Sequence, residues 1–148
     1  MIKYDIYPKY ADKDFAFLFK AQERINDYFV FDINEDFLKY PILNLDYEDI
    51  FENELNNVLN DDCYYNASGL ILFSKKVVDI LKNLDGNITF YSCKLRNQPI
   101  DIFALYKRND VESDYVIRNS EKPTSYYFSE LFIDLIVKNN WNIDYYQV

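Results

Sequence analysis

The sequence predicts an α+β fold, in which helices pack on an antiparallel or mixed sheet. Three observations support this prediction: short segments that alternate polar and apolar residues, amphipathic segments with helical spacing, and one helix-strand unit that occurs twice. The length of 148 residues and the apolar fraction of 49% are typical of one globular domain, which we expect to span 1–148.

Short alternating or apolar segments bounded by turn residues predict the strands. The segment Ile2–Tyr7 alternates as a half-buried strand does, and Pro8 ends it. The turn Asn97-Gln98-Pro99 joins two such segments and predicts a hairpin. Strands are expected over Ile2–Tyr7, Tyr28–Ile33, Ile88–Leu95, Ile100–Lys107 and Tyr115–Ile117.

Two further segments have the spacing and the terminal residues of helices. The acidic segment Asp46–Asn60 carries apolar residues on one face and carboxylates on the other, which predicts an amphipathic helix. Ser74 is a favourable N-cap for a helix over Lys75–Leu84, which Asp85-Gly86 ends. The apolar face of the acidic helix would consist of Ile50, Phe51, Leu55, Val58 and Leu59.

One helix-strand unit occurs twice. Residues Phe73–Tyr91 align without gaps on Phe128–Tyr146, at a spacing of 55 positions and with six identical residues among nineteen. Each copy begins with Phe-Ser, and we expect the hydroxyls of Ser74 and Ser129 to accept a backbone N–H at the start of the helix. Two copies of a helix followed by a strand imply a sheet covered by helices.

The excess negative charge is concentrated in one segment. Between Asp32 and Asp62 there are ten acidic residues and one basic residue, Lys39, whereas the rest of the chain has 15 of each. A negative field repels the phosphates of nucleic acids and anionic lipids, and it attracts basic protein surfaces. The segment therefore predicts either a docking surface for a basic protein or a solvated helix face that only aids solubility.

The residue types exclude most catalytic chemistry. The chain has no histidine, which rules out Ser-His-Asp and Cys-His catalysis and the commonest zinc sites. The two glycines, Gly69 and Gly86, cannot form a phosphate-binding loop, so we expect no nucleotide cofactor. Paired carboxylates remain an alternative, because a small hydrolase or a site for a hard cation needs only acids. The favoured expectation is a protein without catalytic residues, metal or cofactor.

We expect the chain to be cytoplasmic. The first ten residues lack the apolar core of a secretory signal, and no apolar run is long enough to span a membrane. Cys63 and Cys93 have neither the spacing nor the neighbours of disulfides or metal sites, and we expect buried thiols.

A protein interface is expected at the acidic segment and the residues that follow it. The carboxylates would guide a basic partner, and aromatic side chains would anchor it. Tyr4, Tyr7 and Tyr10 are further interface candidates, with packing inside the sheet as the alternative. The predicted partner-binding residues are Asp46, Tyr47, Glu48, Asp49, Phe51, Glu52, Glu54, Asp61, Asp62, Tyr64 and Tyr65.

Three segments of the C-terminal half carry a resemblance to a known group of proteins. Leu72–Val77 opens a helix with Leu-Phe-Ser-Lys-Lys-Val, Ile88–Leu95 follows as a strand, and Phe128–Tyr146 forms the last unit. In these segments the chain resembles bacterial immunity proteins of polymorphic-toxin systems, in particular immunity protein families eleven and forty-three. The resemblance implies a cytoplasmic antidote that binds and blocks a cognate toxin and has no catalytic residues of its own.

The sequence thus favours an immunity-type protein, monomeric or homodimeric, that neutralises a toxin with a basic surface and binds neither nucleic acid nor membranes. Two alternatives stay open. One is a small carboxylate-based enzyme or metal-binding protein, and the other is a phage or mobile-element accessory protein with a structural interface.

Overall fold

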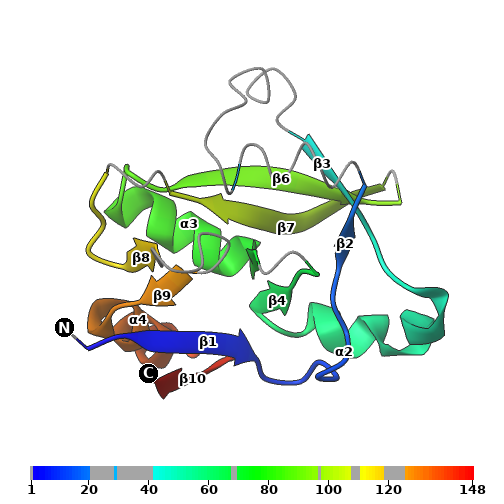
Figure 1. Cartoon of the computed structure of the whole chain (residues 1–148), viewed down its shortest axis with the longest axis horizontal. Helices are drawn as coiled ribbons and strands as arrows, with labels where there is room; N and C mark the ends of the chain where they lie inside the picture. Colours follow the sequence, from blue (N-terminus) through cyan, green and yellow to red (C-terminus); the bar gives the residue numbers. More distant parts are fainter. Residues whose placement is uncertain are drawn as a thin grey trace.

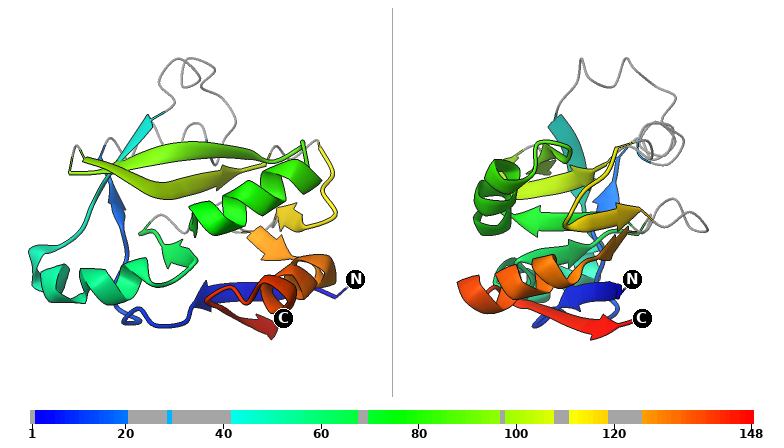
Figure 2. Two further views of the ribbon diagram at one scale, coloured as in Figure 1. Left: turned by 180° about the vertical axis from the view of Figure 1, so that it is seen from behind. Right: turned by 90° about the vertical axis from the view of Figure 1, so that its left-hand side faces the viewer.

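The structure, a computed structural model, describes residues 2–20, 29, 42–67, 70–96, 98–107, 111–118 and 126–148. Within these residues the chain forms two β-sheets with helices packed against them, which confirms the α+β prediction (Figure 1). The two longest helices lie on the same side of the molecule (Figure 2, right). No helix among the described residues is long and apolar enough to cross a membrane.

The larger sheet has six strands in the order β2-β3-β6-β7-β5-β4. It is mixed, because β3 runs parallel to β6 while the other neighbours are antiparallel. Its strands are β2 (Leu18–Phe19), β3 (Ile42–Asp46), β4 (Cys63–Tyr65), β5 (Ile71–Ser74), β6 (Thr89–Leu95) and β7 (Gln98–Tyr106). The predicted hairpin is confirmed as β6 and β7, but the turn is shorter than predicted, because Gln98 and Pro99 belong to β7 and pair with Leu95 and Lys94.

The smaller sheet has four antiparallel strands in the order β10-β1-β9-β8. Its central strand β1 comes from the start of the chain, whereas the other three come from its last third (Figure 1). Its strands are β1 (Tyr4–Pro8), β8 (Val116–Arg118), β9 (Tyr126–Phe128) and β10 (Ile143–Gln147). The strands predicted over Ile2–Tyr7 and Tyr115–Ile117 are thereby confirmed, each shifted by one or two residues.

Four helical segments whose bounds lie within the described residues accompany the sheets. They are the 3-10 helix η2 (Asp49–Glu54) and the α-helices α2 (Leu55–Leu59), α3 (Lys75–Leu84) and α4 (Glu130–Asn139). The bounds predicted for α3 are confirmed. The strand predicted over Tyr28–Ile33 lies outside the described residues apart from Phe29, and there it is wrong, because Phe29 is helical; its ring is fully buried.

The prediction of one amphipathic helix over Asp46–Asn60 is wrong at its start. Asp46 ends strand β3, and the helical part begins at Asp49 as a 3-10 helix. The reason is that Leu43, Leu45 and Tyr47 are all buried at alternate positions, which holds this stretch extended. Of the five apolar residues assigned to the helix face, only Val58 is buried, and Ile50 and Leu59 are 79% and 41% exposed.

The repeat predicted from the sequence is confirmed and is larger than one helix and one strand. We define unit A as β4, β5, α3, β6 and β7, and unit B as β8, β9, α4, β10 and β1. Both begin and end their helix at positions 55 residues apart, and the strand orders β6-β7-β5-β4 and β10-β1-β9-β8 correspond one to one. Unit B is therefore a second copy of unit A whose central strand is supplied by the beginning of the chain.

The register of the strands supports this correspondence residue by residue. In unit A, Phe103 on the central strand pairs with Ser92 on one side and with Phe73 on the other. In unit B, Tyr4 pairs with Gln147 on one side and with Phe128 on the other. Gln147 and Phe128 lie 55 positions after Ser92 and Phe73.

The backbone bond that precedes each helix is equivalent too. Ser74 N donates to the carbonyl of Asp62 at 3.1 Å, and Ser129 N donates to the carbonyl of Tyr115 at 3.0 Å. Two regions of the chain that share few identical residues thus fold to the same local geometry.

The apolar core has two parts. One lies between the helices and both sheets, where the equivalent residues Phe73 and Phe128 meet with ring centroids 6.0 Å apart. The other covers the face of unit A that is turned away from α3, and it is built from residues 15–19, Phe29, β3 and Val58. We call the sheet face turned away from the helix of each unit its far face.

Candidate functional site

The structure separates the predicted partner-binding residues into a buried group and a group that is half-buried or exposed. Tyr47, Asp61, Asp62 and Tyr64 are buried. Because these side chains are almost entirely buried, they are withdrawn from the predicted surface that anchors a partner, although Asp61, Asp62 and Tyr64 contribute to the lining of a pocket beside α3.

Asp61 has a structural role. Its carboxylate accepts the backbone N–H groups of Lys9, Tyr10 and Ala11 at 2.9, 2.9 and 2.8 Å, and so holds the chain that leaves β1. Burial raises the pKa of this carboxyl, and the three N–H donors act against that rise. The donors come from about fifty positions earlier in the chain, so no local pattern could reveal the role.

Asp62 joins the two units. Its carboxylate accepts the hydroxyl of Ser74 and the backbone N–H of Asn142, both at 2.7 Å. The predicted capping role of Ser74 is therefore wrong, because its hydroxyl donates to Asp62 instead of accepting from its own helix. The equivalent prediction for Ser129 is confirmed, since its Oγ accepts the N–H of Phe132 at 3.4 Å.

The two buried tyrosines are also accounted for by contacts within the chain. The hydroxyl of Tyr64 donates to the carbonyl of Asp61 at 2.7 Å, and burial raises its pKa. The ring of Tyr47 lies under the guanidinium of Arg96, whose Cζ is 4.2 Å from the ring centroid. Both side chains support the segment between them without facing a partner.

The exposed acids gather at the 3-10 helix η2. We define the acidic tip as residues 48–54, which carry the exposed Glu48, Asp49 and Glu52 and the half-buried Glu54 next to the exposed side chain of Ile50. Phe51 points inward, where its ring packs edge-on against Phe15 with centroids 5.5 Å apart. The tip is thus an exposed acidic and apolar surface fixed to the core beneath it.

Arg96 neutralises part of this charge. Its Nε donates to Asp46 at 2.9 Å and its Nη2 to Asp49 at 2.6 Å. The pKa of Asp46 is lowered, first by the backbone N–H of Tyr47 and then by Arg96. Among the described residues Glu48, Glu52 and Glu54 form no ion pair, so their charges remain available to a partner. Three further acids of the segment between Asp32 and Asp62 lie outside the described residues: Asp32, Glu35 and Asp36.

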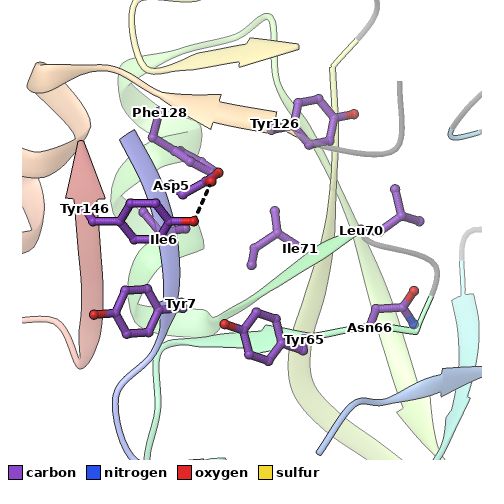
Figure 3. Close-up of a pocket in the computed structure, with 10 residues that line it drawn as sticks. All are labelled: Asp5, Ile6, Tyr7, Tyr65, Asn66, Leu70, Ile71, Tyr126, Phe128 and Tyr146. Atoms are coloured by element: carbon purple, nitrogen blue, oxygen red, sulfur yellow. Dashed lines mark hydrogen bonds between the residues drawn. The ribbon is translucent and has the colours of Figure 1, made fainter. Parts of the chain in front are cut away.

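A second candidate site is a pocket of about 250 Å³ where the two sheets meet (Figure 3). The side chains of Tyr7, Tyr65 and Tyr146 surround it together with Asp5. The hydroxyl of Tyr146 donates to Asp5 Oδ2 at 2.9 Å, and this bond raises the pKa of Tyr146. The ring centroids of Tyr7 and Tyr146 lie 5.9 Å apart.

Sequence reasoning found this pocket in part. Tyr65 was among the predicted partner-binding residues and Tyr7 among the tyrosines that could form an interface, and both line it. Asp5 and Tyr146 were missed. A usable signal existed, because the alternation of Ile2–Tyr7 places Asp5 and Tyr7 together on the polar face of a half-buried strand.

The described residues contain neither a cluster of metal ligands nor an exposed thiol. Within the described ranges, no three side chains of Cys, Asp or Glu gather closely enough to hold a metal ion. Cys63 and Cys93 are both buried free thiols. Burial raises the pKa of both, to about 12 for Cys93, so neither forms a reactive thiolate at neutral pH.

The described residues thus offer the acidic tip and the tyrosine-lined pocket as surfaces for binding, and a second pocket of about 320 Å³ lies between α2, α3 and β7, where Lys75, Lys76 and Asp101 line it together with Asp61, Asp62 and Tyr64. Comparison with known proteins adds no further constraint, because no family model, no curated protein and no solved structure matches the chain.

Proposed function

We propose that the protein binds and neutralises a partner protein with a basic surface, as the resemblance to bacterial immunity proteins implies, and that the acidic tip is the docking surface. The observation that carries this proposal is Ile50, which is 79% exposed in the middle of four acids. An exposed branched apolar side chain with charges around it has the composition of an interface centre with a polar rim.

The tip is preorganised for binding. Phe51 is held by Phe15, Val58 is fully buried below, and Arg96 bridges Asp46 and Asp49. Because these contacts already fix the backbone, the segment loses little conformational freedom when a partner binds. The acids and Ile50 are presented on a rigid element.

Charge and apolar contact have different roles in this proposal. The unpaired carboxylates of Glu48, Glu52 and Glu54 raise the association rate with a basic surface, and they do so less at high salt. Full burial of Ile50 in a partner contributes about 1.5–3 kcal/mol, which mainly slows dissociation. A toxin whose substrate is a polyanion has a basic cleft of this kind, and covering the cleft blocks the substrate.

The test uses the protein encoded next to this chain's gene, because the resemblance implies that the toxin and its antidote are encoded together. A variant with Glu48→Gln, Glu52→Gln and Glu54→Gln removes the unpaired charge of the tip. We expect its association rate to fall about tenfold at low ionic strength and its salt dependence to flatten. The measurement is stopped-flow or surface-based kinetics over a salt series.

A matched control separates the tip from the net charge of the protein. The variant Asp101→Asn, Glu112→Gln and Asp134→Asn removes three exposed carboxylates outside the tip. Its association rate should stay within about twofold of the wild-type rate, because screening confines most of the steering to charges within a Debye length. Equal rates for both triple variants would remove the tip from the proposal.

A further inference from the structure

The internal repeat allows the pocket in unit B to be compared with a filled site in unit A. The far-face positions Asp5, Tyr7 and Tyr146 of unit B correspond in strand register to Ala104, Tyr106 and Tyr91 of unit A. Two tyrosines are therefore retained at equivalent positions, and the residue between them on the central strand changes from alanine to aspartate.

In unit A, an aromatic ring fills the equivalent place. Phe29 packs edge-on against both Tyr91 and Tyr106, with ring centroids 5.7 Å away in each case. The alanine between them is fully buried. This site is closed and apolar, and its occupant belongs to the chain itself.

In unit B, the equivalent place is open. Tyr146 is 54% exposed, and the space in front of Asp5, Tyr7 and Tyr146 continues into the pocket shown in Figure 3. Among the described residues that line it, none is basic and Asp5 is the one that carries a charge. A volume of about 250 Å³ accepts a group of several heavy atoms, since water occupies about 30 Å³ per molecule in the liquid.

A carboxylate beside tyrosine rings selects a cation. Aromatic faces attract ammonium and guanidinium groups, and a carboxylate with one bond from Tyr146 still accepts further hydrogen bonds. The chain shows the same combination at Arg96, whose guanidinium covers the ring of Tyr47 and donates to Asp46 and Asp49. A planar guanidinium uses both features at once, because it can stack on a ring while its N–H groups point to a carboxylate.

We propose that the pocket lined by Asp5, Tyr7, Tyr65 and Tyr146 receives an arginine side chain of the bound partner protein. The source of the arginine rests on the proposed function, whereas the selectivity of the pocket for a guanidinium is a property of this chain alone. The arginine occupies in unit B the place that Phe29 occupies in unit A.

The test titrates the full chain with N-acetyl-arginine methylamide and follows the aromatic and backbone NMR signals. Saturable shifts are expected at Tyr7, Tyr65 and Tyr146. The citrulline analogue has the same shape without the charge and should bind at least about tenfold more weakly. Asp5→Asn should weaken binding of the arginine probe by about tenfold, and its backbone spectrum reports whether it folds.

Two further variants complete the design. Tyr65→Leu should weaken binding several-fold through loss of the ring face, and Asp134→Asn, an exposed carboxylate on α4 outside both the pocket and the acidic tip, is a matched control that should leave binding unchanged. The proposal is overturned if citrulline binds as well as arginine, if Asp5→Asn has no effect, or if the shifts map elsewhere. Tighter binding of tetramethylammonium than of the arginine probe would also overturn it, since the pocket would then suit a small quaternary amine.

The results separate this inference from the proposed function. If the arginine probe fails while the charge variants of the acidic tip still slow association with the partner, only the pocket assignment is lost. If the probe binds in the pocket while the tip variants associate normally, the pocket stands and the tip is not the docking surface.

Discussion

Strands β7 and β1 hold equivalent places at the centre of units A and B, yet their far faces differ in chemistry. On β7 the far-facing residues Ala104 and Tyr106 are buried under other parts of the chain. On β1 the equivalent residues Asp5 and Tyr7 are half-buried and line a pocket. The helix-facing residues do not diverge in this way, since apolar side chains from both units fill one common core.

The difference arises from what joins the units. Between β1 and β4 the chain inserts residues 9–62, and this insertion supplies Phe15, Phe17, Phe19, β3 and Val58 to the far face of unit A. Between β7 and β8 the equivalent connection is only residues 107–115. The two units thus share one arrangement of strands and helix, but the far face of unit A is covered by other parts of the chain, whereas the far face of unit B lines a pocket.

The largest expected effect on stability comes from removing the contact between Phe73 and Phe128, which joins the two units. Phe73→Ala and Phe128→Ala should each lower the free energy of unfolding by about 3–5 kcal/mol, because each removes a fully buried ring from the common core. The double variant should lose less than the sum, since the two rings contact each other. Urea denaturation measures these values, and the milder Leu substitutions serve if an Ala variant does not fold. Strict additivity would contradict a shared core.

A smaller effect distinguishes the two equivalent serines. Ser129→Ala removes a helix cap and a hydrogen bond that the hydroxyl donates to the exposed carbonyl of Asp114, and it should cost about 1 kcal/mol. Ser74→Ala should cost more, about 1–3 kcal/mol, because it leaves the buried carboxylate of Asp62 without a hydroxyl donor.

A double-mutant cycle checks this assignment. In an Asp62→Ala background the cost of Ser74→Ala should shrink to a few tenths of a kcal/mol, whereas the cost of Ser129→Ala should stay the same. If both serines respond alike to Asp62→Ala, the difference between the two helix starts is not due to Asp62.

The smallest effect on stability is expected from a rearranged chain in which β1 follows β10, as β7 follows β6 in unit A. Val148 and Ile2 correspond to Cys93 and Asp101, and the seven residues that separate these two in the β6–β7 hairpin can be replaced by Met1 and six added residues. Joining Val148 to Met1 by six turn-forming residues and opening the chain between β7 and β8 gives a circular permutant. Its unfolding free energy should lie within about 1 kcal/mol of the original, because exposed connections tolerate such changes. A permutant without native circular dichroism would contradict the equivalence of β1 and β7.

Local signals were sufficient for part of the fold. The bounds of α3 followed from Ser74 and Asp85-Gly86, and the hairpin followed from a turn between two alternating segments. The repeat was visible because the residues that begin each helix and face the core are similar in both copies. These features depend on residues close together in the sequence.

The features that were missed depend on residues far apart. Leu43, Leu45 and Tyr47 lie on an extended segment and not on a helix, because β3 pairs with β6 and these side chains pack in the core on the far face of unit A. In the sequence, Asp61 has the features of a surface acid. Its structural role depends on the backbone N–H groups of Lys9–Ala11, which donate to its carboxylate from about fifty positions earlier. The pocket likewise forms only because β1 inserts between β9 and β10, a pairing of chain segments more than a hundred residues apart.

That insertion has a consequence for biosynthesis. Unit A consists of contiguous residues and can assemble as soon as they have left the ribosome, whereas β1 is made early and must wait until β9 and β10 have been synthesised. Until then both edges of β1 are unpaired, so a nascent chain stalled before residue 126 exposes Tyr4 and Ile6 to chaperones and proteases.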